Sequence, residues 1–103
     1  MKDPIRGRTL RWSYEDGPVK GKTFEHTFGE DGTVTWREVG AEVGGGEAGA
    51  KYEVATVTDD VYVVAYLAAS GWTLTTVVDT RARRIVSFAS NEKALVVQHG
   101  TLL

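Results

Sequence analysis

Histidine and tyrosine are the side chains of this sequence that could move protons inside a folded domain. His26 lies between Phe24 and Phe28 at alternating positions, so on a strand these three side chains would share one face. Imidazole titrates near neutral pH, and a tyrosine hydroxyl donates well in an apolar pocket. We therefore take His26 and Tyr14 as candidate catalytic residues. For His26 the alternative is a structural core histidine bonded to a tyrosine.

Composition excludes several other chemistries. The chain has no cysteine, which rules out disulfides, thiolate zinc sites and cysteine nucleophiles. Two histidines do not favour a multi-histidine metal site, so we expect neither a metal nor a cofactor. The 12 basic residues against 14 acidic ones argue against a nucleic-acid partner, which would need a basic surface.

The sequence also gives no sign of a membrane segment. Its longest nearly apolar run, from Val61 to Ala69, is far shorter than the ~20 residues of a membrane-spanning helix. The first residues do not form the apolar leader of a secreted protein. We therefore expect a cytoplasmic protein without a membrane partner.

Alternation of apolar and polar residues dominates the chain and predicts one all-β domain over residues 1–103. We expect eight strands, rich in Thr, Val, Tyr, Trp and Phe, as strand surfaces prefer. The strands are Thr9–Tyr14, Lys22–Phe28, Thr33–Val39, Lys51–Thr58, Val61–Leu67, Trp72–Asp79, Arg84–Ala89 and Lys93–His99.

Short turn sequences separate most of these segments and predict antiparallel neighbours. Glu30-Asp31-Gly32, Ala69-Ser70-Gly71 and Asn91-Glu92 are examples. Eight such strands in order predict an up-and-down antiparallel barrel, with a two-sheet sandwich as the alternative. The longer segment Gly40–Ala50 carries five glycines and is either a surface connection or a lid over the barrel mouth.

The aromatic residues fall mostly on one face of each strand, which we expect to be the interior. The expected interior aromatic residues are Trp12, Tyr14, Phe24, Phe28, Trp36, Tyr52, Tyr62, Tyr66 and Trp72. Buried tyrosine hydroxyls need hydrogen-bond partners, so several of them in one apolar cavity predict a site for a small hydrophobic or aromatic molecule. The alternative is that the rings simply fill the core.

The later strands are apolar on both faces. With Tyr62, Tyr66, Trp72, Leu74 and Ile85 inside, an apolar outer patch remains. The expected patch is Val63, Leu67, Val77, Val86, Phe88 and Val96. A patch of this kind predicts a homodimer. The alternative is that inside and outside are inverted on these strands.

Several motifs in order along the chain resemble one group of small barrels. They are Trp12-Ser13-Tyr14-Glu15-Asp16-Gly17, Val61-Tyr62-Val63-Val64-Ala65-Tyr66, Gly71-Trp72-Thr73-Leu74-Thr75 and Ser87-Phe88-Ala89-Ser90-Asn91. The sequence resembles the MoaF-like proteins and the related bacterial phenolic acid decarboxylases. This resemblance implies a lipocalin-like (calycin) barrel with an internal pocket.

The resemblance also locates the positions at which the decarboxylases do their chemistry. Their two carboxylate-binding tyrosines correspond to Trp12 and Tyr14, their arginine falls near Lys51, and their catalytic glutamate falls on Ala68. Lys51 thus joins the candidate ligand-binding residues. Alanine cannot supply a proton, so we expect no phenolic acid decarboxylation. A ligand-binding barrel and a cofactor-free isomerase, cyclase or lyase both remain open.

Overall fold

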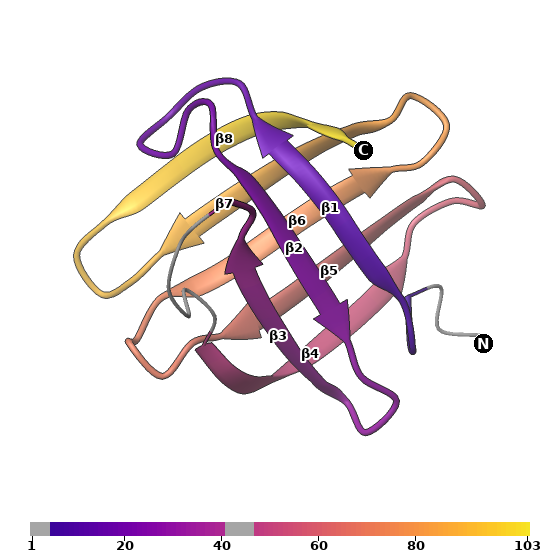
Figure 1. Ribbon diagram of the computed structural model, residues 1–103, viewed down its shortest axis with the longest axis horizontal. Coiled ribbons are helices and arrows are strands. Elements are labelled where there is room, and N and C mark those ends of the chain that lie inside the picture. Colours follow the sequence, from indigo (N-terminus) through magenta and orange to yellow (C-terminus); the bar gives the residue numbers. More distant parts are fainter. Residues whose placement is uncertain (1–4, 41–46) are drawn as a thin grey trace.

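The computed structural model describes residues 5–40 and 47–103. They form a closed barrel in which each of eight antiparallel strands pairs with its neighbours in sequence, and the last strand pairs with the first (Figure 1). The strands are β1 (Thr9–Tyr14), β2 (Thr23–Phe28), β3 (Thr33–Glu38), β4 (Glu47–Thr56), β5 (Val61–Leu67), β6 (Thr73–Asp79), β7 (Arg84–Ser90) and β8 (Leu95–Leu102). The predicted all-β, eight-stranded up-and-down barrel is confirmed.

Side chains of turn residues fix the hairpins. Asp31 Oδ1 accepts hydrogen bonds from the Thr33 backbone N–H and hydroxyl, at 3.0 and 2.7 Å. Asn91 Oδ1 accepts from the N–H groups of Lys93 and Ala94 in the same manner. Such bonds replace backbone pairing where the chain reverses, which is why Asn and Asp are favoured there.

The seam between β1 and β8 closes the barrel over a short register. Three residue pairs join the two strands, and Tyr14 lies opposite Gly100. A Cβ atom at Gly100 would overlap the Ser13 carbonyl oxygen and approach Ile85 Cδ1 to 3.0 Å. Glycine is therefore required for this close approach of the backbones.

Two strands differ from their predicted bounds by more than one residue. β4 begins at Glu47 rather than Lys51, and its register with β3 shifts between Val34 and Trp36. β8 begins two residues later than predicted and runs on to Leu102, because that end pairs with β1. Residues 41–46, which belong to the expected Gly40–Ala50 connection, lie outside the described part of the chain.

The structure decides which face of the later strands is inside. Tyr62 and Tyr66 are buried, so the inverted arrangement is wrong. Trp72, expected among the interior rings, lies immediately before β6, is 37% exposed and is not part of the buried core. The outward position expected for Val96 is wrong as well, since Val96 alternates with the exposed Val97.

The outer wall is charged on one side and apolar on the other. On β1–β3, Glu25 bonds to Arg11 and Arg37 at 2.6 and 3.0 Å. On β5–β8, Leu67, Phe88, Leu95 and Val97 are exposed. Within the described residues, no helix is long and apolar enough to cross a membrane.

Candidate functional site

An aromatic cluster centred on His26 occupies the interior between β1, β2, β3 and β5. The imidazole stacks on Trp12 with ring centroids 4.3 Å apart and an interplanar angle of 18°. Trp36 and Tyr66 complete the group, with their own centroids 4.6 Å apart. Trp36 lies opposite His26 in the β2–β3 register, so the two side chains point to the same face of the sheet, which is the interior of the barrel.

His26 is neutral in this environment. It is 2% exposed, and burial lowers its pKa from 6.5 to about 3. Its Nε2 atom lies 2.9 Å from Tyr66 Oη, the contact expected of a structural core histidine. Its Nδ1 atom is buried and has no hydrogen-bond partner among the described residues.

Tyr14 belongs to a separate chain of interior hydrogen bonds. Trp12 Nε1 donates to Tyr14 Oη at 2.9 Å, and that hydroxyl lies 3.0 Å from Ser87 Oγ. Ser87 Oγ in turn lies 2.8 Å from Thr76 Oγ1. Burial raises the pKa of Tyr14, against the smaller opposing effect of these bonds. This series of hydrogen bonds links β1 to β7 and β6 through the centre of the barrel.

Ser87, Thr76 and Gln98 are interior polar residues that the candidate site residues predicted from the sequence do not include. Gln98 on β8 lies opposite Ser87 and is 6% exposed, and its Oε1 atom is buried without a hydrogen-bond partner among the described residues. The sequence did contain a signal for their inward position, because each of these three polar residues alternates along its strand with neighbours that point outward. Gln98, for example, alternates with Val97 and His99.

Burial inside the barrel is uneven along its length. Phe28, Val34, Val78 and Ile85 are at most 1% exposed. By contrast, the inward-facing Phe24, Trp36 and Leu74 are only half-buried. These three lie toward the end of the barrel that carries the β1–β2 and β5–β6 connections. The interior is therefore less completely buried at this end of the barrel.

Two other candidate residues are placed differently from what a shared interior site requires. Lys51 points outward with an 83% exposed side chain, 3.7 Å from Glu53, so its expected role inside the barrel is wrong. Lys51 and Tyr52 are consecutive on a strand and must face opposite sides. The Tyr52 hydroxyl donates to the Gly29 carbonyl at 3.1 Å, at the end of the barrel that carries the β2–β3 connection.

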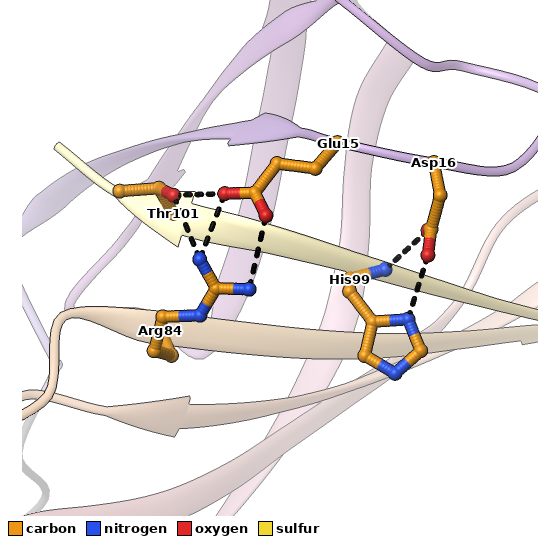
Figure 2. A network of polar contacts seen from close by, with 5 residues as sticks. All are labelled: Glu15, Asp16, Arg84, His99 and Thr101. Atoms are coloured by element: carbon orange, nitrogen blue, oxygen red, sulfur yellow. Dashed lines mark hydrogen bonds and ion pairs between the residues drawn. The ribbon is translucent and has the colours of Figure 1, made fainter.

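A polar network holds the connection after β1 against the last two strands (Figure 2). Glu15 binds the Arg84 guanidinium through both oxygens, at 2.8 and 3.0 Å, and also accepts from the Thr101 hydroxyl. Asp16 accepts from the His99 backbone N–H at 2.7 Å and lies 2.9 Å from its Nδ1. These hydrogen bonds lower the pKa of both carboxyl groups.

Metal binding finds no support in the described part of the chain. No group of three or more His, Cys, Asp or Glu side chains there could hold an ion. The site is thus a neutral, mainly aromatic interior with hydroxyl, amide and imidazole groups.

Comparison with known proteins identifies a family and solved structures of similar fold. The family model for the MoaF N-terminal domain matches residues 2–94. The crystal structure of a "putative beta-lactamase" from Burkholderia vietnamiensis superposes with a TM-score of 0.80 at 21% identity, covering 100% of this chain and 97% of the other. At that identity the likeness concerns the fold alone. No curated protein sequence matches the chain.

Proposed function

This chain belongs to the family of the MoaF N-terminal domain, and we propose that it is a lipocalin-like protein that binds a small hydrophobic or aromatic molecule inside its barrel. The observation that carries the proposal is the interior itself. Aromatic rings stack around His26, and two buried polar atoms have no partner among the described residues. Apolar walls with a few convergent polar groups are typical of small-molecule sites.

Proton-transfer catalysis has weaker support than binding. A general acid or base works best when its pKa lies near the working pH. Burial moves the pKa of His26 down to about 3 and that of Tyr14 upward, so both candidates shift away from neutrality. A cofactor-free isomerase, cyclase or lyase would need a ligand that reverses these shifts.

The activity named for the Burkholderia structure is not proposed for this chain. The buried serine of the barrel, Ser87, bonds to the hydroxyls of Tyr14 and Thr76. Thr76 is not a general base, and burial raises the pKa of Tyr14, which keeps its hydroxyl protonated, so neither partner activates Ser87 as a nucleophile.

Native mass spectrometry of the freshly purified protein tests the proposal directly, and a copurified small molecule is the expected result. Calorimetric titration supplements it with three probes that share a naphthalene ring system: β-naphthol, its methyl ether and β-naphthoate. We expect at least one of them to bind with one-to-one stoichiometry.

A matched pair of variants locates the binding. Leu74 is a half-buried inward residue, whereas Leu67 is 62% exposed on the outer face of the neighbouring strand. Leu74→Trp should abolish the titration heat by filling the interior, and Leu67→Trp should leave it intact. The proposal fails if no molecule copurifies and none of the three probes binds, or if both variants bind alike.

A further inference from the structure

From the polar groups that line the interior, we propose that the ligand is uncharged and donates a hydrogen bond to Gln98 Oε1. This inference rests on the proposed function and names the class of molecule that the barrel takes. An aromatic alcohol, a phenol or a ring N–H compound would satisfy it, and a carboxylate would not.

The first argument is the absence of a cation from the described interior. Its described polar groups are hydroxyls, the Gln98 amide and the His26 ring, which is neutral because burial disfavours its protonation. Charged side chains on the inward alternation occur at the strand ends, where Glu38 on β3 and Lys22 just before β2 lie 3.4 Å apart with side chains 35% and 49% exposed.

A buried anion without a cationic partner is strongly disfavoured. Moving an ionised carboxylate out of water costs far more than moving a hydroxyl, unless a positive group accompanies it. Lys51, the basic residue that could have served, points to solvent on the outer wall. The interior therefore discriminates against anionic ligands by their charge.

The second argument is the hydrogen-bonding state of Gln98. Its Oε1 atom is a buried acceptor without a partner among the described residues, and the opposing Ser87 hydroxyl is engaged with Tyr14 and Thr76. A buried acceptor left unpaired is unfavourable, so a ligand that brings an O–H or N–H group gains this bond.

The position of Gln98 along the barrel follows from its closeness to the β1–β2 connection. Gly17, in the β1–β2 connection, lies directly over Gln98, since a Cβ there would come within 2.7 Å of Gln98 Cγ. Gly17 has a φ of 79°, which suits glycine. Gln98 therefore lies beneath the β1–β2 connection, at the end of the barrel that also carries the half-buried Phe24.

Titration of the wild-type protein with the three naphthalene probes at neutral pH tests the charge and donor requirements. β-Naphthol is neutral and donates a hydrogen bond, its methyl ether lacks the donor, and β-naphthoate is an anion. We expect the ether to bind about tenfold more weakly than β-naphthol, the effect of one unmet buried hydrogen bond. We expect the anion to bind more weakly still.

Gln98→Met keeps the length of the side chain and removes its acceptor. This variant should no longer distinguish β-naphthol from the methyl ether. Val97→Met, which places the same residue on the outer face one position away, should keep the wild-type preference.

Each result has a distinct meaning. Naphthoate binding as tightly as β-naphthol would overturn the uncharged class, and an undiminished preference in Gln98→Met would overturn the role of Gln98. Either result leaves the proposed function in place, whereas that function itself fails if no molecule copurifies and none of the three probes binds. The wild-type comparison holds even if Gln98→Met does not fold.

Discussion

Acidification should destabilise this protein through His26 well before its carboxylates are protonated. The pKa of His26 is about 3 in the folded state and about 6.5 in the unfolded chain. Because the folded-state pKa is the lower one, the unfolded state binds the proton more tightly. The contribution of His26 to the free energy of unfolding is complete above about pH 6.5 and is lost as the pH falls toward 3.

The expected loss in the free energy of unfolding follows from the pKa values of His26 in the folded and unfolded states. Below the unfolded-state pKa, each pH unit removes about 1.4 kcal/mol from the free energy of unfolding. Between about pH 7.5 and about pH 5, the loss due to His26 is therefore about 2 kcal/mol. This interval lies above the range in which Glu15, Asp16, Glu25 and Asp31, whose pKa values are lowered, begin to protonate.

Urea unfolding followed by tryptophan fluorescence at the two pH values measures this loss. His26→Phe keeps a planar ring against Trp12 and removes the titrating group, so its stability should barely change between the two pH values. Both proteins are best compared in a His99→Asn background, which removes the other histidine of the sequence. An equal loss in both proteins, or an NMR titration of His26 near its ordinary pKa, would refute the reasoning.

Two further predictions concern the closure and the outer wall of the barrel. Gly100→Ala should lower the free energy of unfolding by about 3 kcal/mol, because the added Cβ overlaps the Ser13 carbonyl. The control Gly21→Ala adds a Cβ that meets no atom within 4 Å, so it should lower the free energy of unfolding by only about 1 kcal/mol, from its positive φ. Equal losses for the two variants in urea unfolding would contradict this account. The protein should sediment as a dimer through the apolar outer face, and the double variant Leu67→Glu, Phe88→Glu should sediment as a folded monomer; a wild-type monomer, or unfolding of the variant, would contradict the dimer.

The architecture was predictable because strand period and turn chemistry are local properties. Strict alternation from Thr9 to Tyr14 and the Asp31-Gly32 turn each determine structure over a few residues. The bounds of β8 were less predictable. Its extension to Leu102 depends on pairing with β1, which lies at the other end of the chain.

The candidate site was only partly predictable for a similar reason. Trp12, His26, Trp36 and Tyr66 meet as alternation indicated. Lys51 was placed by resemblance, and alternation, which put it beside the inward Tyr52, was the better guide. The Glu15–Arg84 contact joins residues 69 positions apart, so no local pattern could reveal it.

The polarity of the interior is not needed to close this barrel. Eight strands leave an interior that side chains alone can fill, and apolar residues would do so without unpaired groups. Here two buried atoms, Gln98 Oε1 and His26 Nδ1, have no partner among the described residues. Each such atom costs about 1–3 kcal/mol, a large share of the 5–15 kcal/mol typical of a folded domain. An apolar replacement such as Gln98→Met would remove one of these costs, so stability does not account for the amide, whereas the hydrogen bond that we propose from a ligand would.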